Sequence, residues 1–161
     1  MSKTNISALI HTKNNAQQLG RVLDSLRPCG EVVVVDHGST DDTIKVAREH
    51  GAKVVQGVSG VDRGAYVQDA GNDWILCLLP SEALAEEMET SLFDWRENEH
   101  ADNLIGFNMA IREQNGHGWK FLPAEMRLVN RRQVNWIGDL PPKDPNAPSL
   151  QGQIVRIPVS E

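Results

Sequence analysis

The sequence has few cysteines, no excess of basic residues and no long apolar run, and each of these absences excludes a class of protein. Its two cysteines, Cys29 and Cys77, provide neither a disulfide framework nor a zinc site. A formal net charge of −6 argues against a surface for nucleic acid or anionic lipid, since both attract a basic stripe. The first residues, MSKTN, lead directly into a short strand pattern, so the sequence predicts no signal peptide and no transmembrane segment. We therefore expect a single cytoplasmic domain over residues 1–161, with both thiols reduced.

Two common nucleotide-binding motifs are also missing. The sequence has no Walker loop, and no G-x-G-x-x-G pattern follows a strand pattern. ATPase and dinucleotide-binding functions are therefore excluded. The apolar fraction of 40% is ordinary for a globular domain, so the function has to be sought in other motifs.

The most informative segment is the run over residues 31–43, which reads EVVVVDHGSTDDT. Its four consecutive valines are too few for a helix and too apolar for a strand that faces water. They predict a strand over 31–36 that is buried on both faces. Asp36 stands where this strand ends, and Gly38 and Ser39 begin the turn into a helix. Ligands of open parallel sheets bind outside the carboxyl ends of the strands, so this segment predicts a ligand site beside Asp36.

Strand and helix patterns alternate in the first half of the chain, which predicts right-handed βαβ units and a mainly parallel sheet. Strands are expected at 5–11, 31–36, 53–56 and 73–79. The first helix carries the apolar positions Leu19, Val22, Leu23 and Leu26 and is ended by Pro28 and Gly30. A second helix is expected between an N-cap at Thr40 and Gly51, and a third over 62–70.

The second half of the chain has a different character. We expect a helix over 82–97, then strands at 104–112, 119–122, 127–129 and 153–159. The turn sequence QNGHG at 114–118 predicts an antiparallel hairpin between the first two of these strands. The stretch 138–148 (GDLPPKDPNAP) contains four prolines and is predicted to be a loop.

Several phrases match one known pattern in order and spacing. They are TKNN at 12–15, DHGSTDDT at 36–43, VAREHGAK at 46–53, GNDWILCL at 71–78 and, more weakly, PAEMRLVNRRQVNW at 123–136. With these phrases the chain resembles the family-two glycosyltransferases of the GT-A fold, above all the lipopolysaccharide-core glucosyltransferase-like branch. The resemblance implies an α/β fold of GT-A type: a mainly parallel sheet with flanking helices and a small antiparallel extension. A nucleotide-binding half would cover about 1–82 and an acceptor-side half about 83–161.

The resemblance also implies a function and a set of site residues. Such proteins bind a nucleotide-diphosphate sugar, usually a uridine one, and transfer the sugar with inversion to an acceptor, here an unidentified carbohydrate or lipid-linked group. The implied nucleotide-binding residues are Thr12, Asn14, Asp36, Gly38, Ser39 and Arg63. Asp36 would accept a hydrogen bond from the base, as a carboxylate at a strand end can.

The sequence departs from the family where metal and base are expected. Members carry D-A-D-E or a similar D-x-D that holds Mg²⁺ or Mn²⁺, whereas this chain has Leu79, Pro80, Ser81 and Glu82. No metal site is therefore predicted. Glu82 stays as a tentative catalytic residue, or as a surface residue at a helix start. The family's G-x-x-H-E phrase is replaced by Gly-Asp-Leu-Pro-Pro, which makes Asp139 the candidate base or simply a turn residue. Asn15 replaces the usual Glu.

Other interpretations stay open at this point. The chain could be a non-catalytic relative that binds a ligand or a partner protein as an accessory subunit, or a nucleotidyltransferase-type enzyme on a similar fold. His11, His37 and Asp36 could ligate a transition metal. Further alternatives involve a sugar stacked on Trp119 or Trp136 and a diphosphate bound by Arg127, Arg131 or Arg132.

Overall fold

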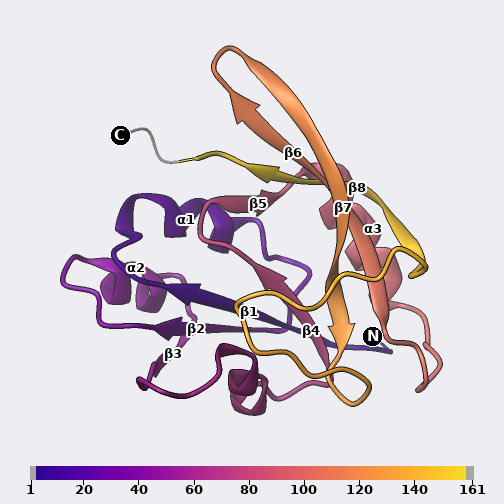
Figure 1. Cartoon of the computed structure of the whole chain (residues 1–161), viewed down its shortest axis with the longest axis horizontal. Helices are drawn as coiled ribbons and strands as arrows, with labels where there is room; N and C mark the ends of the chain where they lie inside the picture. The colour runs from indigo at the N-terminus through magenta and orange to yellow at the C-terminus, as the bar shows by residue number, and fades with distance from the viewer. Residues whose placement is uncertain (1–2, 159–161) are drawn as a thin grey trace.

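The computed structural model describes residues 3–158, and four parallel strands form the first part of its sheet. They lie in the order β3-β2-β1-β4, and their bounds are β1 (Ile6–Thr12), β2 (Glu31–Asp36), β3 (Lys53–Gln56) and β4 (Trp74–Leu78) (Figure 1). Every residue of β1 and β4 is buried, and β2 is buried from Val33 to Asp36. The prediction of a valine-rich strand buried on both faces is therefore confirmed.

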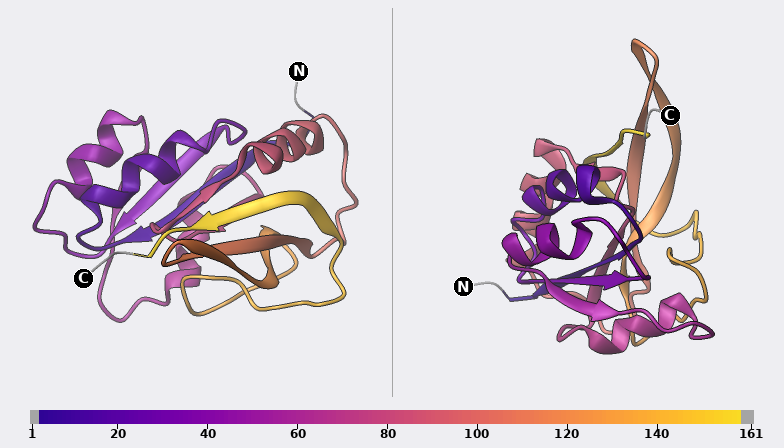
Figure 2. Two further views of the ribbon diagram at one scale, coloured as in Figure 1. Left: turned by 90° about the horizontal axis from the view of Figure 1, so that it is seen from above. Right: turned by 90° about the vertical axis from the view of Figure 1, so that its left-hand side faces the viewer.

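The remaining four strands extend this sheet on the β4 side in the order β7-β6-β8-β5. Their bounds are β5 (Glu82–Leu84), β6 (Gly106–Asn115), β7 (Gly118–Asn130) and β8 (Ser149–Arg156). The pairs β4–β7, β6–β7 and β5–β8 are antiparallel, whereas β6–β8 is parallel. The predicted hairpin is confirmed, and its β6–β7 tip projects well beyond the rest of the molecule (Figures 1 and 2). The fold is thus α/β, with the expected antiparallel extension.

The two faces of the sheet are covered differently. On one face lie α1 (Ala16–Asp24), α2 (Thr43–Glu49) and α3 (Glu86–Arg96), which pack on alternate residues of the strands such as Ile10 and Leu76 (Figure 2). The other face is covered by a short 3-10 helix, η1 (Arg63–Asp69), and by the long segment 131–148, here called the covering segment. Strand alternation sends successive side chains to opposite faces, so both layers build a core on the same strands.

The covering segment has no helix or strand, as the prolines predicted, but it is attached to the sheet. Val134, Trp136, Leu140 and Ala147 pack against the second core. The side-chain amide of Asn108 in β6 donates hydrogen bonds to the carbonyl oxygens of Asp144 and Ala147, at 2.9 and 3.2 Å. This irregular segment is therefore held over the face of the sheet that carries η1.

Two helix predictions were wrong at their starts or ends. The first helix ends at Asp24, because the Ser25 hydroxyl donates to the carbonyl of Val22 and terminates the last turn. The second helix has Asp42 at its N-cap rather than Thr40, since the Asp41 carboxylate accepts the backbone N–H of Thr43. Gly51 follows this helix with φ +79°, as a residue that ends a helix in the left-handed region does.

The largest correction concerns residues 82–97. The expected helix starts only at Glu86, because residues 82–84 form strand β5 and pair with β8, Glu82 opposite Arg156. The segments 119–122 and 127–129 belong to one strand, β7, whose register shifts against β6 between Met109 and Ile111. The closing strand spans Ser149–Arg156, and residue 159 of the predicted 153–159 lies outside the described residues. Among the helices of residues 3–158, none has the length and apolar character needed to cross a bilayer.

We predict that Gly64→Ala destabilises the fold, because η1 and the covering segment meet backbone to backbone at this glycine. A Cβ at Gly64 would lie 1.8 Å from the Trp136 carbonyl oxygen. Since backbone has to move to relieve such overpacking, we expect a loss on the order of 2 kcal/mol in the free energy of unfolding, measured with urea. Gly138→Ala, in the same segment but with no atom within 4 Å of its Cβ, is the control. Equal stability of the two variants would contradict the close contact.

Candidate functional site

The polar residues of the predicted site gather at the carboxyl ends of β1 and β2. The parallel register sets Thr12 opposite Asp36, and the Thr12 hydroxyl donates to Asp36 Oδ1 at 3.3 Å. Both side chains are almost fully buried. The structure thus brings together two residues that the sequence assigned to one site.

The carboxylate of Asp36 is occupied by its own loop. Oδ2 accepts the backbone N–H groups of Gly38 and Ser39 at 3.2 and 2.9 Å, and Oδ1 accepts the Ser39 hydroxyl at 2.5 Å in addition to Thr12. With 1% of its surface exposed, Asp36 has no lone pair directed to solvent. Its observed task is to fix the turn that follows β2.

Asn14 has a similar structural task on the neighbouring loop. It is the one residue besides glycine with positive φ (+55°) in the described part of the chain, a conformation that asparagine tolerates. Its side-chain oxygen accepts the N–H of Thr40 at 2.8 Å, and its own N–H donates to the Ser39 hydroxyl at 2.8 Å. These bonds connect the loop after β1 to the loop after β2.

A cavity of about 390 Å³ lies beside these loops, at the carboxyl ends of β2 and β3. Its wall consists of His37, Gly38, Gln56, the segment 57–61 and Arg63. Val58 and Val61 present exposed apolar side chains there. The Tyr66 hydroxyl oxygen accepts the Val58 N–H at 2.7 Å and so anchors the segment. The cavity combines apolar surface with a few polar groups, as small-molecule sites do.

His37 of this wall forms a hydrogen-bonded pair with His11, which lies behind it. His11 Nδ1 and His37 Nε2 lie 2.8 Å apart, the rings are stacked, and Tyr66 meets both edge-on. Burial lowers the pKa of His11 to about 4, and burial and the Arg63 charge also lower the pKa of His37. Within residues 3–158 no group of three or more His, Cys, Asp or Glu side chains is arranged to hold a metal ion. The short distance is that of a hydrogen bond between two rings.

Arg63 and Asp139 face each other although they are far apart in sequence. Nη1 of Arg63, at the start of η1, lies 3.0 and 3.1 Å from the two carboxylate oxygens of Asp139 in the covering segment. Both side chains are partly exposed. The structure therefore places the predicted nucleotide-binding arginine and the predicted base at the same spot on the cavity rim.

Glu82 lies elsewhere, in a buried ion pair with Arg127. Glu82 Oε1 is 2.6 Å from Arg127 Nη1, Glu82 Oε2 is 2.9 Å from Nη2, and both side chains have 0% exposure. Arg156 and the N–H of Leu79 complete the hydrogen bonding of the carboxylate. Burial alone would raise the pKa of Glu82, but the hydrogen bonds and charge of Arg127 outweigh it and lower the pKa. Glu82 is therefore an ionised internal partner, with no free oxygen for a metal or a substrate.

None of Arg127, Arg131 and Arg132 lies in the wall of the cavity beside His37. Arg127 points to Glu82, Arg131 donates to the carbonyl oxygens of Val67 and Ala70, and Arg132 is exposed near Asp73. Cys77 is buried and burial raises the pKa of its thiol to about 12, so it cannot serve as a nucleophile.

The two candidate sugar-stacking tryptophans lie apart. Trp119 lies on the projecting hairpin, with the Arg112 guanidinium over its ring. Trp136 packs its backbone and ring against Gly64 of η1.

Sequence reasoning did not assign Tyr66 or the segment 57–61 to the site. The closely spaced glycines Gly57 and Gly60 after a short strand were the available signal.

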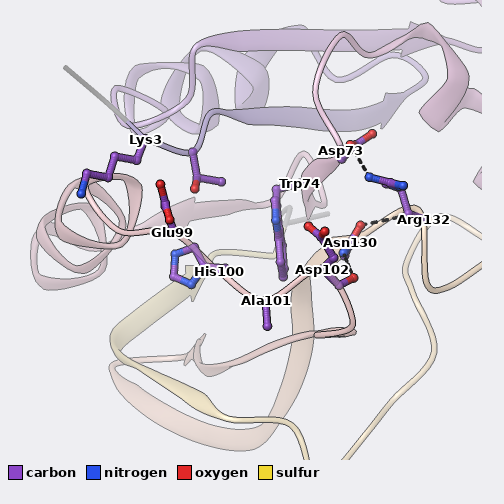
Figure 3. Close-up of a pocket in the computed structure, with 10 residues that line it drawn as sticks. Lys3, Asp73, Trp74, Glu99, His100, Ala101, Asp102, Asn130 and Arg132 are labelled. Atoms are coloured by element: carbon purple, nitrogen blue, oxygen red, sulfur yellow. Dashed lines mark hydrogen bonds and ion pairs between the residues drawn. The ribbon is translucent and has the colours of Figure 1, made fainter.

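A larger cavity, of about 520 Å³, is at the opposite end of the sheet (Figure 3). It lies at the amino-terminal ends of β1 and β4, around Trp74, His100 and Asn130. In Figure 3 Arg132 reaches toward Asp73, and Asn130 donates to the carbonyl of Asp102 at 3.1 Å. Since parallel sheets bind ligands at their carboxyl ends, the smaller cavity beside His37 is the candidate site.

We predict that Glu82→Gln strongly destabilises the protein. The substitution would remove the fully buried counter-charge of Arg127 and leave it only the partly exposed Glu125, whose Oε1 lies 3.1 Å from Arg127 Nε. Breaking a buried ion pair costs about 3–5 kcal/mol in comparable cases. Urea unfolding measures this loss. Glu113→Gln is the control, because Glu113 is half-exposed and 3.7 Å from Arg156, and we expect a change within about 0.5 kcal/mol. A mild effect of Glu82→Gln would mean that the pair is dispensable.

We also predict a pH dependence of stability that originates at His11. Its pKa falls from 6.5 to about 4 on folding, so the unfolded chain binds more protons between these values. Stability is therefore fully present above pH 6.5 and declines as the pH falls toward 4, by about 3 kcal/mol in total. His11→Phe should remove this part of the decline in urea unfolding between pH 7 and 4.5, whereas the exposed His117→Phe should keep it. Parallel curves for wild type and His11→Phe would refute the assignment.

Comparison with known proteins relates the chain to glycosyltransferases. An uncharacterized glycosyltransferase of Rickettsia felis is 37% identical over 91 residues, which are 54% of this chain and 32% of the relative. A second, from Rickettsia bellii, is 32% identical over 110 residues, which are 66% of this chain and 37% of the relative. The chain thus spans about a third of the length of these relatives. No family model matches the sequence.

The fold agrees with a solved structure. TarS of S. aureus superimposes with a TM-score of 0.56 and 21% identity, covering 74% of this chain and 38% of that protein. The chain is therefore similar in sequence to glycosyltransferases, and its fold is of the GT-A type found in the family-two enzymes.

Proposed function

We propose that this chain is a glycosyltransferase domain that binds a nucleotide-diphosphate sugar, of the uridine type, in the cavity beside His37. The observation that carries the proposal is the position of this cavity. It lies at the carboxyl ends of β2 and β3, next to the loop that Thr12, Asp36 and Ser39 build, and it has Arg63 on its rim. Relationship to glycosyltransferases supports a sugar nucleotide as the ligand.

The parts of the cavity suit the parts of such a ligand. The exposed side chains of Val58 and Val61 offer apolar surface to a flat base. Arg63 provides the guanidinium that would pair with the diphosphate, since its planar fork matches phosphate oxygens. Thr12, Asn14, Asp36, Gly38 and Ser39 then act by shaping the two loops. The nucleotide would bind to the half of the domain formed by residues 1–82. The acceptor would approach from the half formed by residues 83–161.

Binding of the diphosphate would change the partner of Arg63. In the structure Arg63 is paired with Asp139, and both are partly exposed. A phosphate at Arg63 would compete for the same guanidinium and release the Asp139 carboxylate. In the proposed reaction Asp139 takes the proton of an acceptor hydroxyl, whose oxygen attacks the anomeric carbon. The bond between that carbon and the diphosphate breaks, with inversion, and the nucleoside diphosphate leaves.

The Mg²⁺ or Mn²⁺ that is usual in the family does not fit the residues present here. Leu79 and Pro80 have no ligating side chain, and Glu82 is fully paired with Arg127 and Arg156. The neighbouring carboxylate of Glu125 is also bonded to Arg127. No step of the proposed reaction therefore involves a metal ion. Charge on the leaving group would be met by Arg63.

The Arg63–Asp139 pair also favours a second candidate function. If the pair persists when ligand binds, the chain has no free base, and it would act as a non-catalytic subunit that binds a ligand or a partner protein. The two functions differ in whether Asp139 is released, so both can be tested on the same residue.

We expect calorimetry to detect binding of UDP and UDP-sugars with the same affinity in the presence of Mn²⁺ or of a chelator. Arg63→Met should weaken UDP binding about tenfold or more, because a charge-assisted hydrogen bond contributes about 1.5–3 kcal/mol. Arg48→Met, an arginine on α2 away from the cavity, is the control. Absence of binding at millimolar UDP would exclude the nucleotide-sugar function.

Asp139→Asn separates the enzyme from the accessory subunit. Loss of a general base lowers turnover about 10²-fold or more, so we expect UDP release from UDP-sugars to fall by that factor. UDP affinity should not decrease, because Arg63 loses a competing carboxylate. Asp144→Asn changes the same charge in the same covering segment and should leave turnover unchanged. Unaltered turnover in Asp139→Asn would show that Asp139 is not the base, and no turnover in the wild-type protein would support the accessory function.

A further inference from the structure

The wall of the candidate cavity contains an aromatic group that the proposed reaction does not use. His37 directly follows Asp36 in the sequence and lines the cavity with one half-buried ring. The ring is held on several sides: by the hydrogen bond to His11, by the edge of Tyr66 and by Gly57. A Cβ at Gly57 would lie 2.3 Å from His37 Nδ1, so only glycine leaves room for the ring.

Asp36 is not available to a ligand in this arrangement. Its two carboxylate oxygens accept four hydrogen bonds from Thr12, Gly38 and Ser39, and only 1% of the residue is exposed. A ring N–H of a base could reach it only after the loop that these bonds stabilise had opened. Two polar side chains of the cavity wall lie near Asp36: Gln56, whose amide N–H donates to the Asp36 carbonyl oxygen at 3.1 Å, and His37.

His37 has one ring nitrogen in use and one free. Nε2 is bonded to His11, whereas Nδ1, which lies beside Gly57 of the cavity wall, is in contact with solvent and has no hydrogen-bond partner within residues 3–158. Burial and the charge of Arg63 lower the pKa of His37, so its ring is neutral at pH 7. A neutral imidazole can accept a hydrogen bond at one ring nitrogen and donate one from the other. Nδ1 is therefore open to a ligand in the cavity.

We propose that His37 is the residue that recognises the nucleobase, by hydrogen-bonding its polar edge through Nδ1, and that His11 is the positioning residue behind it. The proposal rests on the nucleotide-binding function and assigns the contact with the base to His37 instead of Asp36.

The pair of histidines explains how His37 can match a uracil edge. A neutral imidazole carries one proton, so Nδ1 of His37 accepts when Nε2 donates to His11 and donates when Nε2 accepts from it. Uracil presents a ring N–H flanked by two carbonyl oxygens, and either state of Nδ1 finds a partner on that edge. His11, which is 5% exposed and whose Nε2 has no partner in the described chain, fixes the orientation of the His37 ring.

The experiment compares a ligand that has a base with one that lacks it. Calorimetry of wild type and His37→Phe would be carried out with UDP, with N3-methyl-UDP and with inorganic pyrophosphate. His37→Phe keeps a flat ring but removes both nitrogens, so UDP affinity should fall about fivefold to tenfold while pyrophosphate affinity stays the same. Wild type should prefer UDP over N3-methyl-UDP, and His37→Phe should lose this preference. His117→Phe, on the hairpin turn, is the matched control.

A second measurement needs no variant. The ¹⁵N chemical shifts of the imidazoles in the wild-type protein should change at His37 Nδ1 when UDP is added and stay constant when pyrophosphate is added.

In His11→Phe, the preference for UDP over the methylated ligand should shrink while pyrophosphate affinity is retained, as expected for a positioning residue.

The outcomes separate the two levels of inference. If neither UDP nor pyrophosphate binds the wild-type protein, the nucleotide-binding function fails and the role of His37 fails with it. If UDP binds but His37→Phe leaves its affinity unchanged, or weakens UDP and pyrophosphate equally, nucleotide binding stands and base recognition by His37 is refuted.

Discussion

The buried ion pair between Glu82 and Arg127 is the interaction on which the shape of this sheet depends. Strand β5 follows β4 closely in sequence yet lies at the far edge of the sheet, beyond β7, β6 and β8. The sheet can satisfy both conditions only by curling, and Arg127 spans the curl by bonding Glu82 of β5 and the Cys77 carbonyl of β4. A buried charge is tolerated only when its hydrogen bonds are complete, and here Arg156 and Leu79 complete them. The same completeness removes Glu82 from ligand chemistry.

Because Glu82 is committed to Arg127, the charged groups that remain available near the carboxyl ends of the strands are Arg63 and Asp139. With no free carboxylate after β4, the electrostatics of the candidate site rest on Arg63 and Asp139 at the cavity rim. Their pairing is less buried and therefore exchangeable, which distinguishes it physically from the Glu82–Arg127 pair. The Glu82–Arg127 pair stabilises the fold, and we propose that the Arg63–Asp139 pair takes part in ligand binding.

Much of the fold was predictable from local patterns, and the errors have identifiable causes. The apolar runs of β1, β2 and β4 and the turn at 114–118 were recognised because each is encoded by neighbouring residues. Residues 82–84 were assigned to a helix because EALAEE favours one, whereas pairing with β8 and the charge of Arg127 override that preference. Arg127 was one of three arginines considered as alternative partners of a diphosphate, since nothing in a single sequence marks an arginine as fully internal.

The sequence by itself determined where strands end and which polar residues follow them, and so it placed Thr12 and Asp36 together at the carboxyl ends of β1 and β2. Tertiary structure decided what each polar group bonds to: Asp36 to its own loop, His37 to His11, Arg63 to Asp139, and Glu82 to Arg127. The reason is physical. Periodicity, caps and turns act over a few residues, whereas a charge or an imidazole takes the partner that chain folding brings within about 3 Å, however distant in sequence.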